Sequence, residues 1–311
     1  MMPQKTLTSR AWAELLLLSA IWGGSFLSIR IALDEIGFVT SVAHRVGWAA
    51  LLLWPVILVR GVAIPCSPRI YGAFLVMGIL NNVIPFSLMA WGQLHIETGL
   101  TSIFNAGTAV FGVLAAAIFF ADERLTRRRM LGVGLGFFGV ATAIGLESFR
   151  NFDFRSIAQL SVIAGTIPYA VAGVWARKTL TGLPPELAAA GMLTGSALIM
   201  IPAAMILEGP VRFDLQLRTW GAIGYYAIIA TAGAYLLYYR VLAMAGSGNL
   251  MLCTLLIVPF AITLGALVRD EALSTRAYIG FAILALGLSV LDGRLWRWLF
   301  NKPLPLRDLP R

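Results

Sequence analysis

The chain has 311 residues, of which 59% are apolar and only 13% are charged, and its formal net charge is +9. A soluble domain carries about 25% charged residues, so this composition argues against a water-soluble globular protein. Nucleic-acid binding is not expected, because no basic patch with interleaved aromatic residues lies on a polar element. The two cysteines, Cys66 and Cys253, have no CxxC partner, so we expect neither a metal site nor a cofactor.

Ten apolar segments follow one another along the chain. A helix needs about 20 apolar residues to cross a bilayer, and each segment approaches that length. The pattern predicts an all-α integral membrane protein with ten transmembrane helices. In chain order the segments are Ala11 to Ile31, Thr40 to Val59, Tyr71 to Gln93, Thr98 to Ala121, Met130 to Leu146, Ile157 to Ala176, Glu186 to Leu207, Trp220 to Val241, Asn249 to Val268, and Ala277 to Leu291.

The distribution of basic residues predicts the orientation, because cytoplasmic loops carry an excess of Lys and Arg. A cytoplasmic N-terminus places 16 of the 24 Lys and Arg residues in cytoplasmic segments. The sequence therefore predicts a multi-pass protein of the bacterial inner membrane, with both termini in the cytoplasm. The first apolar run continues through Trp22 and Phe26 without a cleavage site, so we expect a retained helix and no signal peptide.

One block of sequence occurs twice, beginning at Phe120 and again at Val268, 148 residues later. Five spans, an odd number, separate the copies, so the copies should cross the membrane in opposite directions. We expect two inverted five-helix repeats, residues 1–150 and 151–293, around a central cavity, followed by a basic cytoplasmic tail at 294–311. The repeated positions include Asp122-Glu123 with Asp270-Glu271, Thr126 with Ser274, Gly132 with Gly280 and Gly139 with Gly287.

Several short motifs occur in a fixed order along the chain. They are Ala20-Ile21-Trp22-Gly23-Gly24-Ser25-Phe26, Gly78-Ile79-Leu80-Asn81-Asn82, Trp91-Gly92-Gln93, Ser102-Ile103-Phe104-Asn105-Ala106, Asp122-Glu123-Arg124-Leu125-Thr126 and Thr231-Ala232-Gly233-Ala234-Tyr235. With these motifs the chain resembles the EamA-like transporters of the drug/metabolite transporter superfamily, over about Ala11 to Leu291. The resemblance implies ten helices in two inverted units, a central cavity and export of metabolites, with amino-acid exporters among the most similar members.

The chain departs from the family pattern in the fourth span. The family often has Thr-Pro after the Asn-Ala pair, whereas Gly107-Thr108-Ala109 stands there in this chain. We therefore expect the fourth helix to bend less than in the family. Prolines do interrupt the third and ninth spans, at Pro85 and Pro259, where each removes a backbone hydrogen bond. We expect these two prolines to act as hinges, with static kinks as the alternative.

Amide and aromatic side chains supply the candidate cavity residues. An amide that faced lipid would leave its donors and acceptors unsatisfied, so mid-span amides must face protein or a wet cavity. Aromatic rings at the middle of spans suit a cavity for flat apolar groups, although rings also serve as interface anchors. The predicted substrate-cavity residues are Trp22, Asn81, Asn82, Trp91, Asn105, Tyr169, Tyr235 and Tyr238. For the amides, hydrogen bonding between helices is the alternative.

Charged residues are not expected at the middle of any span. No Asp or Glu falls there, and Arg45 lies near the outer end of the second span. Arg45 either attracts a substrate carboxylate or reaches the lipid headgroups. The sequence thus predicts a neutral cavity, and the lack of mid-span Lys or Arg argues against phosphorylated substrates. Gly132, Gly134, Gly136 and Gly139 are interpreted as helix-packing positions and not as a nucleotide-binding loop.

The preferred function is export of small metabolites, most of all amino acids including aromatic ones, by alternating access without ATP hydrolysis. The chain shows no HExxH, GxSxG or P-loop motif, so we expect no enzymatic activity. A carrier of drugs, sugars or nucleotide derivatives is the alternative in the same superfamily. A membrane scaffold or an intramembrane enzyme is the alternative from another class. The expected partners are a small-molecule substrate and membrane lipid, with the chain as a monomer or homodimer.

Overall fold

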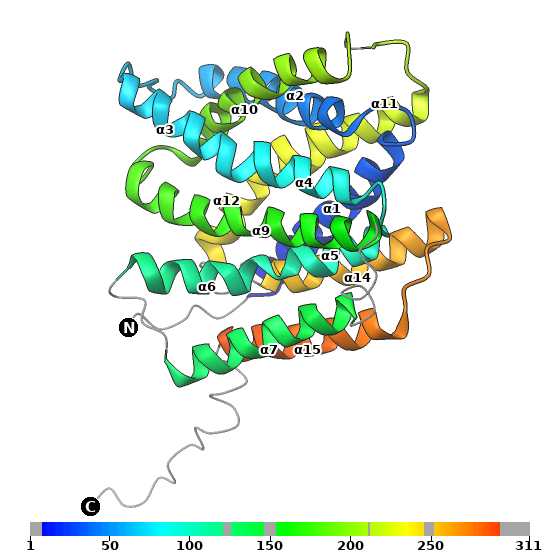
Figure 1. Ribbon diagram of the computed structural model, residues 1–311. Helices are drawn as coiled ribbons and strands as arrows, with labels where there is room; N and C mark the ends of the chain where they lie inside the picture. The colour runs from blue at the N-terminus through cyan, green and yellow to red at the C-terminus, as the bar shows by residue number, and fades with distance from the viewer. Residues whose placement is uncertain (1–7, 121–125, 146–153, 211, 246–251, 293–311) are drawn as a thin grey trace, which may run out of the picture.

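The computed structural model describes residues 8–120, 126–145, 154–210, 212–245 and 252–292, and all regular elements in these ranges are helical (Figure 1). The predicted all-α class is confirmed. The helices are α1 (Ser9–Ala32), α2 (Phe38–Val59), α3 (Pro68–Gly78), η1 (Ile79–Val83), α4 (Ile84–Gly92), α5 (Thr98–Ala106), α6 (Thr108–Phe119), α7 (Arg127–Ile144), α9 (Phe154–Thr179), α10 (Pro185–Leu207), α11 (Leu217–Gly224), η2 (Tyr225–Gly233), α12 (Ala234–Ala245), α14 (Leu252–Arg269) and α15 (Thr275–Asp292).

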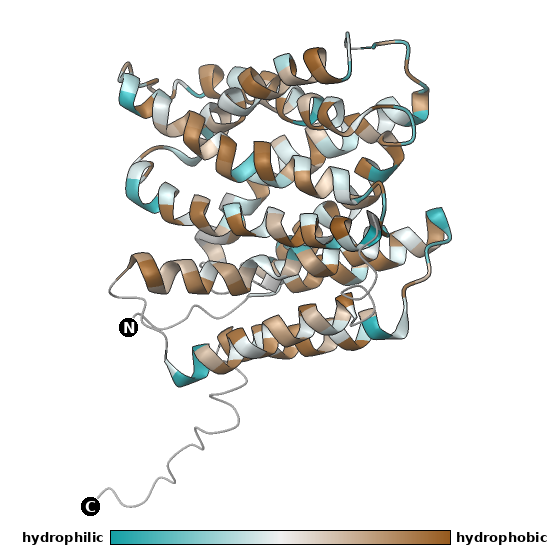
Figure 2. Cartoon of the chain, viewed as in Figure 1, coloured by the Kyte–Doolittle hydropathy of each residue, from teal (hydrophilic) through white to brown (hydrophobic). Residues whose placement is uncertain are grey.

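Long apolar helices make the chain a multi-pass membrane protein. Within the described residues, seven helical stretches are long and apolar enough to cross a bilayer, and the apolar helices 253–269 and 275–291 are shorter. Helices satisfy their own backbone hydrogen bonds, which is what the bilayer interior requires. Figure 2 shows apolar residues along the helices and polar residues gathered near several helix ends. Large side chains such as Leu58 and Ile206 are exposed on the surface, as contact with lipid demands.

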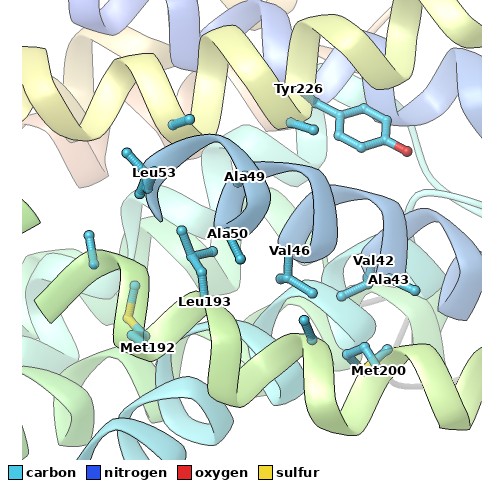
Figure 3. Packing of buried hydrophobic residues seen from close by; sticks show 14 of the residues in the cluster. Val42, Ala43, Val46, Ala49, Ala50, Leu53, Met192, Leu193, Met200 and Tyr226 are labelled. Carbon is cyan, nitrogen blue, oxygen red and sulfur yellow. The ribbon is translucent and has the colours of Figure 1, made fainter. Parts of the chain in front are cut away.

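The largest buried cluster holds α2 between α10 and η2 (Figure 3). Small and branched side chains on one face of α2, among them Val42 and Val46, pack against Leu193 and Met200 of α10. On another face of α2, the fully buried Tyr226 of η2 donates its hydroxyl proton to the Ser41 carbonyl oxygen at 3.3 Å. Alternation of small and large residues lets these helices approach closely without leaving voids.

Helices α7 and α15 lie side by side at one edge of the bundle (Figure 1) and pack through glycines. A Cβ atom on Gly139 would lie 2.8 Å from the carbonyl oxygen of Gly280, and one on Gly132 would lie 2.9 Å from that of Gly287. These four glycines are the ones that the sequence repeats, Gly132 with Gly280 and Gly139 with Gly287. The contacts cross over, because Gly139 meets Gly280 and Gly132 meets Gly287. The packing role predicted for the glycines of this helix is confirmed for Gly132, Gly136 and Gly139, where an added Cβ would lie within 3 Å of a neighbouring helix. A Cβ on Gly134 would meet nothing within 4 Å.

Carboxylates link the helices at one end of the bundle, which we call the carboxylate end. Glu35, Glu208 and Glu271 accept hydrogen bonds from backbone N–H groups at the starts of α11, α2 and α5. The shortest of these bonds, from Thr40 to Glu208 and from Thr98 to Glu271, measure 2.8 Å. Negative charge at a helix N-terminus is favourable because the unpaired N–H groups and the helix dipole are positive there. Each carboxylate therefore fastens the end of one helix to the start of a distant one.

Ion pairs strengthen the same end. Asp34, just beyond α1, pairs with Arg269 at the end of α14 and with Arg30 of its own helix. Arg155 at the start of α9 pairs with Glu97, which precedes α5, at 2.8 Å. Elements far apart in the sequence are thus held together at the carboxylate end. Asp122-Glu123, the predicted boundary near residue 150, the tail at 294–311 and both chain termini lie outside the described residues.

Candidate functional site: a central cavity

A cavity of about 630 Å³ lies inside the bundle. Side chains from α1, η1, α4, α9, α10, η2 and α12 form most of its wall, and residues of α2, α3, α5, α6, α14 and the α9–α10 connection complete it together with Gln93. Pockets for small molecules typically measure roughly 300–1,000 Å³ and are mostly apolar with a few polar groups. This wall has that character, since it combines Met and Phe side chains with amides, hydroxyls and aromatic rings.

Six of the eight predicted cavity residues line this cavity. They come from five different helices and lie up to 216 positions apart in the chain, so only the fold brings them together. They are Trp22, Asn81, Asn105, Tyr169, Tyr235 and Tyr238.

Two predicted cavity residues, Asn82 and Trp91, are not part of the cavity wall. Asn82 is fully buried, and its amide nitrogen donates to the hydroxyl of Ser196 on α10 at 2.9 Å. Because neighbouring positions on a helix point in different directions, Asn82 faces α10 while Asn81 faces the cavity. Trp91 stacks edge-on against His95, with ring centroids 5.0 Å apart, and packs at the margin of a buried cluster.

Two π-helical segments, η1 and η2, present polar groups to the cavity. A π turn shifts the hydrogen-bond pattern of the backbone, and such turns are frequent at functional sites. The indole nitrogen of Trp22 donates to the carbonyl oxygen of Ala230 in η2 at 3.1 Å. On the other segment, the Asn81 amide donates to the hydroxyl of Tyr235 at 3.3 Å. The two segments thereby position three of the predicted cavity side chains.

The predicted hinge residues have different surroundings. Pro85 is buried in the first turn of α4, directly after η1. Pro259 lies inside α14, where it is exposed and not part of the cavity wall. The helical path that begins at Thr98 is also interrupted, at Gly107 between α5 and α6, without the proline of the family pattern. At this interruption the Thr108 hydroxyl donates to the carbonyl oxygen of Asn105 at 2.6 Å.

The sequence left the role of Arg45 open between a substrate carboxylate and the lipid headgroups, and Arg45 is not among the predicted cavity residues. It lies seven residues after the start of α2, about 10 Å along the helix axis. Its Nε donates to the hydroxyl of Thr231 in η2 at 3.0 Å, and its guanidinium carbon lies 3.9 Å from the centre of the Phe86 ring. Arg45 is part of the cavity wall, so the expectation of a neutral cavity is wrong. The sequence did carry a signal, because a charged residue inside an apolar helix usually marks function.

No described residue of the cavity wall offers a negative charge to Arg45. The wall includes no Asp or Glu and no second Lys or Arg. A charged side chain at the middle of a membrane helix costs roughly 2.5–3.5 kcal/mol on insertion scales. Hydrogen bonding to Thr231 and the contact with Phe86 offset part of that cost.

Gln93 and Asn105 add polar groups to the same wall. The Gln93 amide nitrogen donates to the carbonyl oxygen of Phe26 at 3.0 Å, and its amide oxygen is buried without a hydrogen-bond partner among the described residues. The Asn105 side chain forms no hydrogen bond within the described part of the chain and faces the cavity. The Asn105 amide is therefore available to a ligand, whereas the Gln93 amide oxygen is enclosed by protein.

The cavity reaches unequally toward the two ends of the bundle. Leu180, Thr181 and Leu183, in the connection between α9 and α10, belong to its wall, and they lie at the end opposite the carboxylate end. Toward the carboxylate end, Ile29 and Gln93 are the last wall residues, and the ion pairs and helix caps described above lie beyond them. Within the described ranges, more interactions therefore close the cavity at the carboxylate end than at the opposite end, where Arg60 pairs with Glu186 and Arg240 pairs with Glu14.

Comparison with known proteins identifies relatives along nearly the whole chain. The sequence profile of the EamA-like transporter family matches it twice, over residues 11–145 and 156–291. A "Probable amino-acid metabolite efflux pump" of Escherichia coli (strain K12) is 24% identical, over 91% of this chain and 95% of that protein. A "Probable terminal-alkyne amino-acid exporter" of Streptantibioticus cattleyicolor is 23% identical, over 93% of this chain and 95% of that protein.

A solved crystal structure has the same fold, with a TM-score of 0.63 over 91% of this chain and 97% of the other, at 17% sequence identity. The helical architecture and the two profile matches agree with each other over both halves of the sequence. The chain therefore belongs to the EamA-like transporter family of the drug/metabolite transporter superfamily, and it is a membrane transporter of that type.

Proposed function

We propose that the chain exports small metabolites, amino acids first among them and aromatic ones included. The observation that carries the proposal is the central cavity, which combines aromatic rings with amides and hydroxyls from many helices. Two relatives with amino-acid exporter names support the substrate class. Transport proceeds by alternating access without ATP hydrolysis, and the chain acts as a carrier and not as an enzyme.

The proposed architecture is ten transmembrane helices in two inverted five-helix repeats. Three observations support it. The family profile matches each half separately, and η1 and η2 occupy corresponding places in the two halves. The repeated glycines also contact one another in a reciprocal pattern, Gly139 with Gly280 and Gly132 with Gly287. Reciprocal contacts of this kind are typical of two units related by a two-fold axis.

The proposed location is the bacterial inner membrane with both termini in the cytoplasm. This orientation puts Arg177 and Lys178, together with the α9–α10 connection, on the cytoplasmic side, where positive charge is favoured. The cavity reaches that side, so the conformation corresponds to one that takes up substrate from the cytoplasm. Export then requires the links at the carboxylate end to open while the opposite end closes. Pro85 and Pro259 are proposed to act as hinges in this change.

Efflux from proteoliposomes tests the proposal directly. Purified protein is reconstituted into vesicles that are loaded with labelled amino acids. For at least one amino acid we expect efflux above that from loaded vesicles without protein. A drug, sugar or nucleotide-derivative carrier would show efflux of those compounds and none of amino acids. A scaffold would show no efflux of any compound.

A plugged variant ties the efflux to the central cavity. Gly173 lines the cavity, and a Cβ there would meet nothing within 4 Å, so Gly173→Trp should fold and fill the route. The matched control is Gly134→Trp, where a Cβ also meets nothing within 4 Å but the residue is exposed on α7, away from the cavity. We expect efflux to be lost in the first variant and kept in the second. Equal efflux in both would contradict a route through the cavity.

A further inference from the structure

Arg45 brings an unsatisfied cation to the central cavity. Of its five N–H donors, only Nε has a partner among the described residues, the hydroxyl of Thr231. The two terminal nitrogens, which carry four N–H groups, have no hydrogen-bond or ion-pair partner in the described part of the chain. Thr231 contacts the Nε edge of the guanidinium group and the Phe86 ring covers one of its faces. The edge that carries the two terminal nitrogens, which we call the forked edge, remains available.

The forked edge of a guanidinium group fits one kind of partner best. It donates two parallel hydrogen bonds to the two oxygens of a carboxylate, and such paired bonds are stronger than single neutral ones. A phosphate monoester brings close to two negative charges, and the described wall offers no second cation to balance the second one. The single positive charge therefore matches a carboxylate.

The described wall also determines what else the ligand should carry. An ammonium group would find no carboxylate there, only neutral acceptors such as the amide oxygen of Asn105 and the hydroxyl of Tyr169. Aromatic rings, including those of Trp22, Tyr169 and Tyr238, offer an apolar surface for the rest of the molecule. The net charge of the wall is +1, so a ligand with a net charge of −1 is favoured over a zwitterion with the same skeleton.

We propose that Arg45 binds the carboxylate of the transported substrate and that the cavity prefers monocarboxylates with an apolar or aromatic body over the corresponding zwitterions. This inference rests on the proposed function, in which the central cavity is the transport site. It keeps the cavity as the site of export and changes the order of substrates, because it ranks monocarboxylates above the zwitterionic amino acids, which remain substrates of lower affinity. It also assigns Arg45 a role in specificity, since molecules that lack the carboxylate leave the charge unpaired.

A series of ligands with one skeleton tests the preference. Phenylpropanoate carries only the carboxylate, phenylalanine adds the ammonium group, and phenylalaninamide keeps the ammonium group without the carboxylate. Binding is measured by calorimetry on the purified full chain, with phenyl phosphate as a further arm. We expect phenylpropanoate to bind most tightly, phenylalanine less tightly, and phenylalaninamide and phenyl phosphate not measurably. Binding of phenylalaninamide or phenyl phosphate as tight as that of phenylpropanoate, or tighter binding of phenylalanine, would overturn the proposal.

Substitution of Arg45 separates binding from packing. In Arg45→Gln we expect affinity for phenylpropanoate to fall roughly tenfold or more, because a charge-assisted pair is lost. The melting temperature without ligand should not fall, because no described carboxylate loses its partner. Arg45→Lys should recover part of the affinity, and Arg218→Gln, an equal charge change at an exposed site, should leave it unchanged. Unchanged affinity in Arg45→Gln, or a lower melting temperature with equal losses for all ligands, would refute the assignment.

The same experiments distinguish two kinds of failure. If wild-type protein carries amino acids in proteoliposomes but does not discriminate between acid and amide, the inference about Arg45 is wrong and the proposed function stands. If no compound is transported by either wild-type or Arg45→Gln protein, the proposed function itself fails.

Discussion

At the scale of single residues, the two neighbouring asparagines of η1 have different environments and different roles. Asn81 lines the cavity, and its amide nitrogen donates to the Tyr235 hydroxyl at 3.3 Å, with longer contacts to Met192 Sδ at 3.4 Å and to the Asn82 amide oxygen at 3.5 Å. Asn82 is fully buried, and its own amide nitrogen donates to Ser196 on α10. The Ser196 hydroxyl in turn donates to the carbonyl oxygen of Met192, so it stays satisfied if Asn82 is removed. One asparagine is therefore placed to bind a ligand and the other to join two helices.

This difference predicts opposite effects of two alanine substitutions. Asn82→Ala should lower the free energy of unfolding by about 1 kcal/mol, in the range of interhelical hydrogen bonds in membranes, with KM unchanged. Asn81→Ala should raise KM several-fold and leave the melting temperature nearly unchanged. Thermal melts in detergent and initial rates in proteoliposomes measure both quantities. A raised KM together with an unchanged melting temperature in Asn82→Ala would contradict the placement.

Residue types predicted much of the cavity, because an amide or a mid-span ring has few acceptable places in a membrane protein. The pattern could not predict which of two adjacent asparagines faces inward, since that depends on the π turn of η1, and no sequence period marks it. Arg45 was misplaced for a related reason. Its distance from the end of the apolar run resembles that of a snorkelling residue, and only the packing of η2 against α2 places Thr231 at its Nε.

At the scale of elements, the apolar runs predicted the helical segments well because length and hydropathy are set by the bilayer. The breaks within them were predicted less well. Gly107 interrupts the path from α5 to α6 without a proline, and η2 has no sequence signal comparable to Pro85. That the fourth helix bends less than in the family stays a prediction. The close packing of α7 against α15, in contrast, is predicted by the repeated glycines of the sequence.

The close contact between α7 and α15 leads to a specific prediction for Gly139. A Cβ on Gly139 would lie 2.5 Å from the backbone nitrogen of Leu284, so Gly139→Val must push α7 and α15 apart. We expect a loss of about 1–3 kcal/mol in stability, the usual cost of overpacking, or loss of folded protein. Gly134→Val on the same helix meets open space and should be nearly neutral. Size-exclusion yield and thermal melts compare the two, and equal melting temperatures would show that the helices do not depend on this contact.

At the scale of the whole molecule, an exporter needs two units that can move against each other about a central site. The carboxylate end supplies links between the two proposed units, since Glu271 caps α5 and Glu208 caps α2 across long stretches of sequence. Among the described residues the opposite end has fewer such links, since Arg60 pairs with Glu186 at 2.9 Å and Arg240 pairs with Glu14 at 2.6 Å. This asymmetry is what alternating access requires of one conformation, and inverted halves would provide the second by exchanging roles.

The central claim is that two halves, threaded oppositely through the membrane, enclose the cavity, and the sidedness of repeated positions tests it most directly. Thr126 and Ser274 are equivalent in the two copies and both are exposed.

Each is changed to cysteine in a Cys66→Ser background, and intact cells are treated with a membrane-impermeant maleimide. In a separate sample of the unsubstituted chain, labelling of the exposed Cys66 reports the side on which Thr126 is predicted to lie, and the buried Cys253 should remain unlabelled in every sample. We predict labelling of Ser274→Cys from outside and of Thr126→Cys only after the membrane is opened, whereas labelling of both from the same side would contradict the account.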